Sequence, residues 1–466
     1  MLKNHLLVAL RTLRRERGYA ALNVVGLAVG LACCALIVLY VRDELRYDRH
    51  HEHADRVVRV TRPTAEGSHW AATGPPVGPA LEAAFPEVEA VARIFDFGSS
   101  TVLSVEGREE RFEAPGGVYA DAAVFEVFTL PLLRGDPATA LDRPGSVVLS
   151  ASMAERLFGE ADPVGKTLGF QGPADLTVTG VMADLPPTTH LPFEYAISMA
   201  TFYAEEETDW LDEARTWAGF YTYLLLRRPE DAAALAAKLP GFVDTFFAGD
   251  YDGRPSTQTE LRLQPITDIH LHSKLEKEYA PNGDVLYVWV FALVALFVLV
   301  IAAVNFINLT TARSGHRLRE VGVRKAMGST RGQLARQFLV ESVLTSGLAL
   351  ALAVALVAVA LPLLNGLTGK AFTPADAYAP AALLGLGALA LGTGLLAGLY
   401  PALYMAGFGA VRALRNDPTG RQPALLRRGL VAFQFALSIF MLASTAVVYT
   451  QLDYVRSKAL GFDKER

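Results

Sequence analysis

One stretch of the sequence looks able to bind phosphate. Gly159–Thr167 reads GEADPVGKT and ends in Gly-Lys-Thr, as phosphate-binding loops do. Five residues separate its two glycines where such loops have four, and three of these five are acidic residues or proline. Strand-like sequence follows, where a phosphate-binding loop needs a helix. We therefore predict a structural turn here and no ATP hydrolysis by this chain.

Histidines beside carboxylates suggest a metal site at first sight. One group comprises His50, His51 and His53 with Asp48, Glu52 and Asp55. Zinc needs convergent ligands, and no further His or Cys cluster has the spacing to complete a site, so we expect solvated charge beside a membrane. His270 and His272 alternate, which predicts one exposed face of a strand. Because no hydrolase motif is recognisable either, we expect no enzyme activity and no cofactor.

The most unusual segment is basic and helix-forming. Arg317–Phe338 holds six Lys/Arg residues and a single acid, Glu320, between two long apolar runs. Gly328 is expected to end one helix, and Thr330 with Gln333 has the capping-box spacing that begins the next. The segment is either a surface that a soluble partner can push or a basic belt that sets topology and contacts anionic lipid.

Five apolar runs must position this segment. They are Ala20–Val41, Val285–Leu309, Leu339–Leu364, Pro380–Leu403 and Leu430–Val448. Each meets the requirement of about 20 residues for crossing the hydrocarbon, and backbone groups in lipid need internal partners, so each run is predicted to be a helix. The expected fold is an α-helical bundle of transmembrane spans at 20–42, 285–309, 339–406 (two helices) and 429–449.

Charge predicts the orientation. Segments 1–19, 310–337 and 407–428 contain 5, 7 and 5 Lys/Arg with one acid each, whereas 43–284 contains 20 Lys/Arg and 40 Asp/Glu. By the positive-inside rule the N-terminus is cytoplasmic. The chain then has an amphipathic cytoplasmic segment at 1–19, a cytoplasmic segment at 310–338, a cytoplasmic linker at 407–428 and an outer stub at 450–466.

The large outer segment, 43–284, is predicted to be an α+β domain. Its strand-like stretches are 56–61, 146–150, 175–182 and 221–226, with a hairpin within 101–112. Apolar residues at helical spacing predict helices at 151–157 and 230–247. With no cysteine, the domain must be stabilised by its own core, for which about 240 residues suffice.

Small residues within the spans are expected to pack helices. Gly26 with Gly30, and Gly394 with Gly398, each have the spacing that lets two helices approach closely, within this chain or in a homodimer. The only cysteines, Cys33 and Cys34, are adjacent in the first run, and we interpret them as small apolar packing residues in preference to a redox pair or palmitoylation sites.

These residues resemble a known family, the FtsX-like, MacB-type permeases of ABC transporters, in the type VII exporter superfamily. Four places carry the resemblance: LRTLRRERGY at 10–19 with NVVGLAVG at 23–30; SVVLSASMAERLFGEADPVGKTL at 146–168 with VTGVMADLP at 178–186; REVGVRKAMGS at 319–329; and YPALY at 400–404 with ALR at 413–415. They occur in the family's order and span essentially the whole chain.

The resemblance implies a multi-pass permease of a bacterial inner membrane that binds a cytoplasmic ABC ATPase dimer and transmits its motion to a MacB-like periplasmic core domain. The residues expected to meet the ATPase are Glu320, Gly322, Arg324, Lys325, Ala326 and Gly328. Export or extraction of a peptide, antibiotic or lipoprotein is the implied activity. The alternative is a non-transporting signal transmitter that regulates a cell-wall hydrolase or senses peptides.

Further partners are implied as well: membrane lipids, a periplasmic adaptor, and a second copy or second permease half, but no nucleic acid. The family normally has four spans per unit. Residues 425–466 parallel 13–56 in layout, with a basic flank, an apolar span, a tyrosine and a charged outer segment. We expect the chain to be the first half of a duplicated member, although a fifth helix that ends the protein naturally is the alternative.

Overall fold

The computed structural model describes the backbone of residues 11, 14–63, 67, 69–98, 101–105, 111–170, 175–204, 209–407 and 421–457. The chain forms two compact units. One consists of Met1–Val41 with Val288–Arg466 and is helical, and the other is Arg42–Tyr287. Five described helices are long and apolar enough to cross a membrane, and the second unit separates the first of them from the second. The predicted fold class is therefore confirmed.

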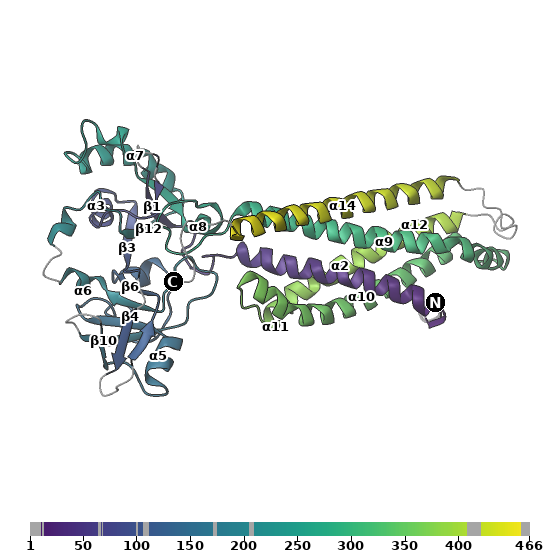
Figure 1. Ribbon diagram of the computed structural model, residues 1–466, viewed down its shortest axis with the longest axis horizontal. Coiled ribbons are helices and arrows are strands. Elements are labelled where there is room, and N and C mark those ends of the chain that lie inside the picture. The colour runs from purple at the N-terminus through teal and green to yellow at the C-terminus, as the bar shows by residue number, and fades with distance from the viewer. Residues whose placement is uncertain are drawn as a thin grey trace. The chain divides into compact units, whose positions relative to one another are not determined.

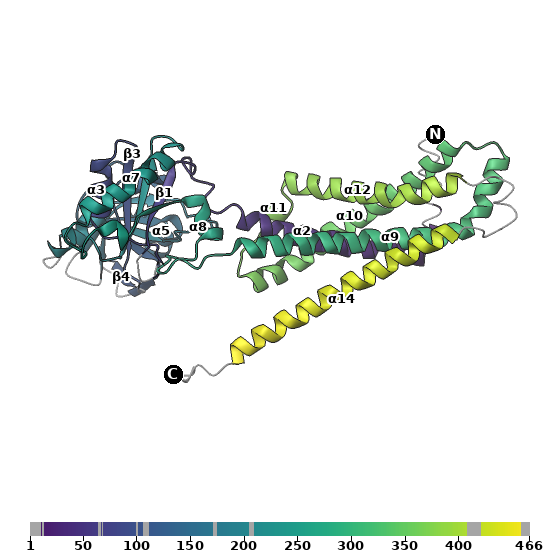
Figure 2. The ribbon, with the colours of Figure 1, turned by 90° about the horizontal axis from the view of Figure 1, so that it is seen from above.

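The helical unit is built from α2 (Arg17–Glu44), α9 (Val285–Ala326), α10 (Arg331–Thr368), α12 (Pro380–Gly407) and α14 (Arg421–Ser457), with the short α11 (Pro374–Ala377) (Figures 1 and 2). Helix α9 continues beyond its apolar run to Ala326, because this stretch contains no proline and its two glycines are isolated among helix-forming residues. Both cysteines are free thiols, and Cys34 is buried.

Small residues form the core of this unit. Four helices contribute its buried members, which are Leu27, Ala28, Leu31, Ala32, Ala302, Ala349, Ala353, Val357 and Ala390. A Cβ added at Gly30 would lie 2.5 Å from the Cβ of Ala302, so α2 and α9 approach closely there. In the same way Gly398 faces Ser342, 2.7 Å from an added Cβ.

The other two predicted packing glycines lie in the same pairs of helices. A Cβ at Gly26 would lie 3.2 Å from the Nδ2 atom of Asn305, and one at Gly394 would overlap the Oγ atom of Ser346. All four glycines therefore face other helices of this same chain, where the missing side chain allows close contact. By contrast, α14 buries none of its apolar span in the described part of the chain.

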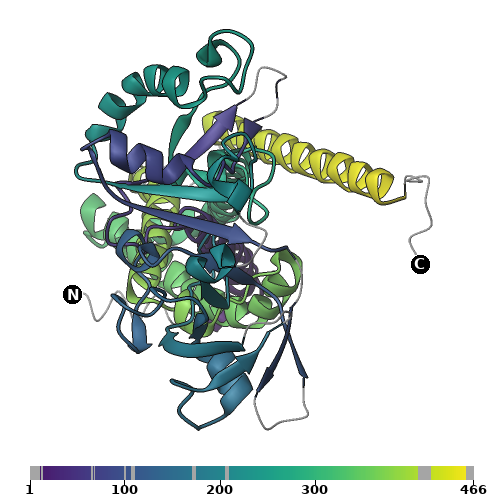
Figure 3. The same ribbon diagram turned by 90° about the vertical axis from the view of Figure 1, so that its left-hand side faces the viewer.

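The α+β unit contains one mixed sheet with the strand order β13-β1-β12-β3-β6-β11-β8-β10-β9-β4-β5, to which β2 adds at β1 and β7 at β10 (Figure 3). The strands are β1 (Val57–Pro63), β2 (His69–Trp70), β3 (Val88–Asp96), β4 (Thr101–Val105), β5 (Arg111–Ala114), β6 (Gly117–Ala120), β7 (Leu132–Arg134), β8 (Ser146–Ser150), β9 (Thr167–Gly169), β10 (Asp175–Met182), β11 (Tyr195–Ser198), β12 (Phe220–Leu226) and β13 (Arg262–Pro265). The four predicted strands and the hairpin, β4–β5, are confirmed.

The helices of this unit are α3 (Val77–Ala84), α4 (Val124–Val127), α5 (Ala151–Phe158), α6 (Met199–Tyr203), α7 (Asp231–Phe246) and α8 (Ile266–His272), with 3₁₀ turns at Asp209–Asp212 and Pro255–Thr257. The helices predicted at 151–157 and 230–247 are thus confirmed. Helices α3 and α7 pack on β1, β12 and β3 around Leu81, Leu224 and Leu239. A second core lies at the other end of the sheet, around Leu149, Leu157 and Ile197.

Candidate functional site

The stretch that resembles a phosphate-binding loop has the predicted structural role. Gly159 ends α5 with a φ of +61°, and the chain then turns into strand β9. The ammonium group of Lys166 lies over the ring of Phe158, 4.9 Å from its centroid, and so is engaged with the protein itself. Among the described residues, no group of three His, Cys, Asp or Glu side chains is arranged to hold a metal ion.

The turn between α9 and α10 is fixed by two complementary caps. At the end of α9, Gly328 has a φ of +93°, which glycine adopts without steric strain. The amide of Ser329 donates to the carbonyl of Arg324 at 3.0 Å, and that of Gly328 to the carbonyl of Lys325 at 3.0 Å. This is a Schellman motif, and it satisfies carbonyls that a helix end otherwise leaves unpaired.

The first turn of α10 is closed by the capping box that the sequence predicted. The hydroxyl of Thr330 accepts from the amide of Gln333 at 3.3 Å, and the side chain of Gln333 accepts from the amide of Thr330 at 3.0 Å. Glycine and threonine are thus two residues apart, one ending a helix and the other beginning the next. The intervening turn therefore has little freedom to change the angle between the helices.

One side of this helical hairpin is buried. Val321 on α9 packs with Leu334 and Phe338 on α10, and each of these three side chains is buried. The guanidinium of Arg324 donates to the side-chain oxygen of Gln337, a second connection between the two helices. Gly322 is also buried.

The opposite side presents apolar and cationic groups together. Val323 is 44% exposed and Met327 is 75% exposed, one helical turn apart on α9. Ala326 and Gly328 are exposed beside them. Desolvation by partial burial, with repulsion from Arg331, lowers the pKa of Lys325. A lysine with a lowered pKa gains from an acidic neighbour, because such a neighbour stabilises its charged form.

The structure distributes the predicted partner-binding residues over both sides. Ala326 and Gly328 are exposed, Arg324 and Lys325 are half-buried, and Gly322 lies inside. The backbone at Glu320 is helical, but its side chain lies outside the described residues. Sequence reasoning left Val323 and Met327 out of the set, although their i, i+4 spacing was the signal that could have included them.

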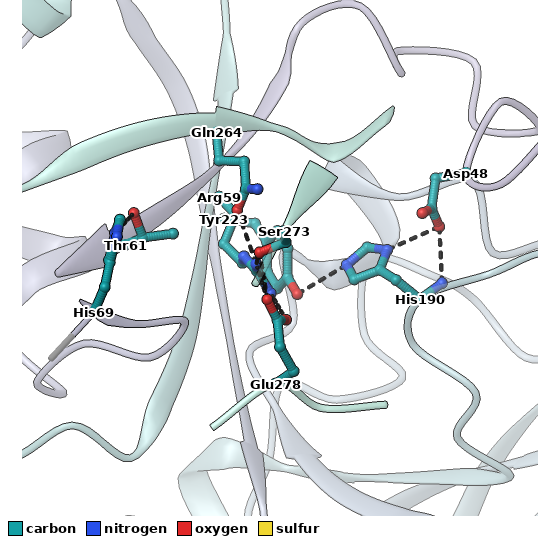
Figure 4. Close-up of polar contacts among 9 residues, drawn as sticks. All are labelled: Asp48, Arg59, Thr61, His69, His190, Tyr223, Gln264, Ser273 and Glu278. Carbon is teal, nitrogen blue, oxygen red and sulfur yellow. Dashed lines mark hydrogen bonds and ion pairs between the residues drawn. The ribbon is translucent and has the colours of Figure 1, made fainter. Parts of the chain in front are cut away.

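The expectation of solvated charge around His50 is wrong for Asp48 and His51, which are buried, whereas Glu52 and Asp55 are exposed as expected. Asp48 is 0% exposed and His51 is 5% exposed. The Oδ1 atom of Asp48 accepts from the amide of His190 at 3.1 Å and lies 2.8 Å from its Nδ1 atom. The Nε2 atom of His190 lies 2.9 Å from the Tyr223 hydroxyl (Figure 4). The residues are buried because the chain folds back over them between β10 and β11.

Burial changes the protonation of this group. Desolvation by burial alone would raise the pKa of Asp48, but electrostatic attraction to His190, whose backbone amide also donates to the carboxylate, lowers this pKa. Desolvation, with repulsion from His50, lowers the pKa of His51 to about 3. His51 is therefore a neutral ring, and its Nδ1 atom accepts from the amide of Thr129 at 3.2 Å.

The strand predicted for His270 and His272 is also wrong. Both residues lie on α8, where positions two apart point in directions that differ by roughly 200°. His270 is therefore buried against Glu44, with Nε2 and Oε2 2.8 Å apart, and the side chain of His272 is 53% exposed.

A second buried polar group surrounds Arg59 on β1, whose side chain is 0% exposed. Its guanidinium donates to both carboxylate oxygens of Glu278, at 2.6 and 2.9 Å. It also donates to Gln264 at 2.8 Å and to the hydroxyl of Ser273 at 3.1 Å (Figure 4). A bidentate pair of this kind has the strong geometry that a buried charge requires.

Comparison with known families identifies two domains. The profile of the MacB-like periplasmic core domain matches residues 20–241, and that of the FtsX-like permease C-terminal domain matches residues 292–409. The first match runs from α2 to α7, and the second covers the α9–α10 turn and all but the first turn or two of α9.

Among known relatives, the chain is 22% identical over 307 residues to the pyoverdine export ATP-binding/permease protein PvdT of Pseudomonas syringae pv. tomato, covering 62% of this chain and 41% of the relative. It is 26% identical over 285 residues to the macrolide export ATP-binding/permease protein MacB of Neisseria gonorrhoeae, covering 58% of this chain and 38% of the relative. The matched region thus spans less than half of either relative.

Solved structures also resemble part of the chain. The periplasmic region of MacB from Actinobacillus actinomycetemcomitans aligns with a TM-score of 0.31 and 14% identity, over 46% of this chain and 90% of that one. The extracellular domain of the noncanonic ABC-type transporter YknZ from Gram-positive bacteria aligns with a TM-score of 0.31 and 12% identity, over 45% of this chain and 99% of that one.

Proposed function

This chain belongs to the family of ABC transporter permeases that combine a MacB-like periplasmic core domain with an FtsX-like permease domain, and from that premise we propose that it couples ATP hydrolysis by a separate cytoplasmic ATPase to motion of its α+β domain. The α9–α10 turn is the proposed point of contact. One observation supports this assignment above the others: an exposed apolar pair lies among cationic residues on a turn that is capped at both ends.

The chemistry of this surface suits a protein partner. Val323 and Met327 gain when a partner removes them from water, and Arg324 and Lys325 supply positive charge for acidic groups on that partner. Because the hairpin is closed by caps and by the Val321 contact, a push on the turn should displace α9 and α10 together.

The proposed location is a bacterial inner membrane with the N-terminus in the cytoplasm. The distribution of Lys/Arg among the short segments supports this orientation, which puts the α9–α10 turn on the side where ATP is available. The α+β domain then lies outside the cytoplasm. A partner ATPase dimer implies two permease copies or halves, and lipids and a periplasmic adaptor complete the proposed set of partners.

The proposed activity is export or extraction of a peptide, antibiotic or lipoprotein. Two relatives are named for the export of pyoverdine and of macrolides. The matched region covers 41% and 38% of their lengths, so their substrates indicate a range of possibilities for this chain and do not select one.

The test is capture and stimulation of the ATPase in membranes that contain the full chain. Met327→Asp changes a side chain that is 75% exposed, so it should leave the hairpin folded while it introduces a charge into the proposed contact. Arg324→Glu also reverses a charge in the proposed contact, but it removes the hydrogen bond to Gln337 that connects α9 and α10, so Met327→Asp is the decisive variant. We expect each variant to lose co-purification of the ATPase and its stimulation at least tenfold, since burying one unpaired charge disfavours binding by more than about 1.4 kcal/mol.

The matched control is Leu133→Asp, the same kind of change at a side chain that is 60% exposed on β7 of the α+β domain. It should leave both readouts unchanged. If Met327→Asp and Arg324→Glu capture and stimulate the ATPase as the native chain does, the α9–α10 turn is not the coupling site.

A further inference from the structure

Two connecting segments link the α+β domain to the spans. Residues 45–56, the incoming segment, follow α2 directly, and residues 273–284, the outgoing segment, lead from α8 to α9. More than 200 residues separate them in sequence. Each segment could be attached to the sheet independently, or the two could be attached to each other.

The incoming segment is held by buried contacts that are not local in sequence. Asp48 has a φ of +58°, a left-handed conformation that aspartate tolerates better than most residues other than glycine. Its amide donates to the carbonyl of Thr188 at 2.9 Å, and its carboxylate accepts from His190. Four residues on, the amide of Glu52 donates to the hydroxyl of Thr129 at 2.7 Å.

The outgoing segment is held as firmly. The amide of Glu276 donates to the carbonyl of His69 at 2.8 Å, and its side chain accepts from the indole of Trp70 at 3.0 Å. Lys277, with a φ of +57°, donates to the carbonyl of Ala218 at 2.9 Å. The carboxylate of Glu278 then accepts hydrogen bonds from both NH2 groups of the Arg59 guanidinium.

The two anchoring groups meet near one edge of the sheet, on the neighbouring strands β1 and β12. Tyr223 on β12 and Arg59 on β1 are directly opposite each other, so their side chains lie on the same face. From Tyr223 the contacts lead through His190 to Asp48, and from Arg59 they lead to Glu278 (Figure 4). The exposed fraction of these side chains is 0% at Asp48 and Arg59, 2% at His190 and 13% at Glu278.

A direct contact reinforces this path at the ends of the segments. Glu44, the last residue of α2, pairs with His270, whose ring stacks on Tyr47 at a centroid distance of 3.3 Å. Gly283 of the outgoing segment passes over the pair so closely that an added Cβ would lie 2.9 Å from the Oε2 atom of Glu44 and from the Nε2 atom of His270.

We propose that this network makes the incoming and outgoing segments one joint, so that loosening either segment loosens the other. Buried polar groups that lose a partner are not rescued by water, so the members of each anchoring group depend on one another. The two groups are joined by the cross-strand neighbours Tyr223 and Arg59, which lie opposite each other on one face of the sheet. The joint would carry motion from α2 and α9 into the sheet together. That role in coupling rests on the proposed function, whereas the linkage between the segments does not.

Hydrogen exchange of the full-length protein in nanodiscs, read by mass spectrometry, tests the linkage without any ATPase. Asp48→Asn should accelerate amide exchange in residues 273–284, and Glu278→Gln should accelerate it in residues 45–56. We expect a roughly tenfold rise in each exchange rate, since this is the change that the loss of one hydrogen bond to a charged group produces. If the two segments are energetically coupled, each must affect the other by the same free energy, so both variants are needed. Residues 146–158, in the distant core of β8 and α5, should keep their native rates.

Tyr223→Phe and Tyr221→Phe form the matched pair. Both tyrosines lie on β12 and point to the same face, but only the hydroxyl of Tyr223 belongs to the network. Tyr223→Phe should accelerate exchange in both segments and Tyr221→Phe in neither. If Asp48→Asn or Glu278→Gln also accelerates exchange in residues 146–158, the whole domain has been destabilised. Tyr223→Phe then tests the linkage, since it removes only one oxygen atom.

The proposal is overturned if each substitution accelerates only its own segment, or if Tyr223→Phe behaves like Tyr221→Phe. Such a result would leave the proposed function untouched, because ATPase capture is measured separately on the α9–α10 turn. Conversely, reciprocal exchange together with unchanged capture by Met327→Asp would retain the joint and reject the coupling site.

Discussion

The α9–α10 turn and the buried network of the α+β domain are both rigid, but for different reasons. The turn is fixed by residues within one short segment, Val321 to Phe338, through a glycine, a capping box and a three-residue apolar contact. The network is fixed by side chains more than 140 residues apart, such as Asp48 and His190 or Arg59 and Glu278.

This difference matches what each region is proposed to do. A surface that binds a partner has to stay exposed, so its stability comes from local caps and leaves Met327 available. A joint that transmits motion gains from burial, because polar contacts without access to water are lost only at a high free-energy cost. Substitutions in the buried network should therefore reduce the free energy of unfolding more than substitutions at the turn do.

The largest effect is expected at the buried pair. Glu278→Leu leaves Arg59 charged and unpaired inside the domain, and we expect it to lower the free energy of unfolding by about 3–5 kcal/mol. Urea denaturation of the detergent-purified chain, followed by the fluorescence of Trp70, Trp210 and Trp217, measures this loss.

Two controls define the mechanism of that loss. Arg59→Met combined with Glu278→Leu removes both charges and should recover most of the stability. Glu194→Gln, at an ion pair with Arg156 whose side chains are 45% and 43% exposed, should change it by less than about 1 kcal/mol. If Glu278→Leu is no worse than Glu194→Gln, the network does not hold the domain.

An effect of intermediate size is expected in the pH dependence of the free energy of unfolding, through the buried His51. The pKa of His51 falls from its ordinary value near 6.5 to about 3 on folding, so between these values the unfolded chain binds a proton that the folded chain does not. The free energy of unfolding should therefore decrease as the pH falls from about 6.5 towards 3, by up to about 1.4 kcal/mol per pH unit from this residue.

His51→Asn keeps an acceptor for the amide of Thr129 and removes the titration, so it should reduce the slope. Some slope should persist, because the pKa values of His50 and Asp48 are also lowered and act in the same direction. A slope equal to that of the native chain would show that His51 is not held neutral. Denaturation midpoints at a series of pH values give the comparison.

The smallest effect is expected at the turn. Thr330→Ala removes the side-chain acceptor of the capping box and should destabilise the start of α10 by about 1 kcal/mol. Amide exchange in residues 323–333 should rise roughly fivefold, the rate change that this energy implies, with no change in the α+β domain. Thr330→Ser, which retains the hydroxyl, is the control. Faster exchange in residues 45–56 would mean that the two regions are not independent.

Much of the framework was predictable because its signals are local. Long apolar runs predicted five membrane helices, alternating β-branched residues predicted β1, β8, β10 and β12, and the pair Thr330 and Gln333 predicted a helix start. At the α9–α10 turn the sequence located the ends of the two helices, but it did not show that Gly322 lies inside and Met327 outside.

The predictions from sequence that proved wrong concern residues whose contacts come from distant parts of the chain. The histidines after the first span were expected in water, since nothing near them in sequence offers a buried partner, and the partner of Asp48 is His190. His270 and His272 have the spacing of a strand, and only the fold makes them part of a helix that buries one against Glu44.

The family was indicated by the resemblance of the sequence motifs. By itself, the sequence also determined the five candidate spans of the described chain, the position of the α+β domain and the ends of the helices at the α9–α10 turn. These depend on hydrophobicity, backbone propensity and capping, which act within a few residues. The tertiary structure alone decided which charges are buried and paired, and thereby the network from Asp48 to Glu278. A side chain is buried only when a segment from elsewhere in the chain covers it, and a short stretch of sequence contains no information about that contact.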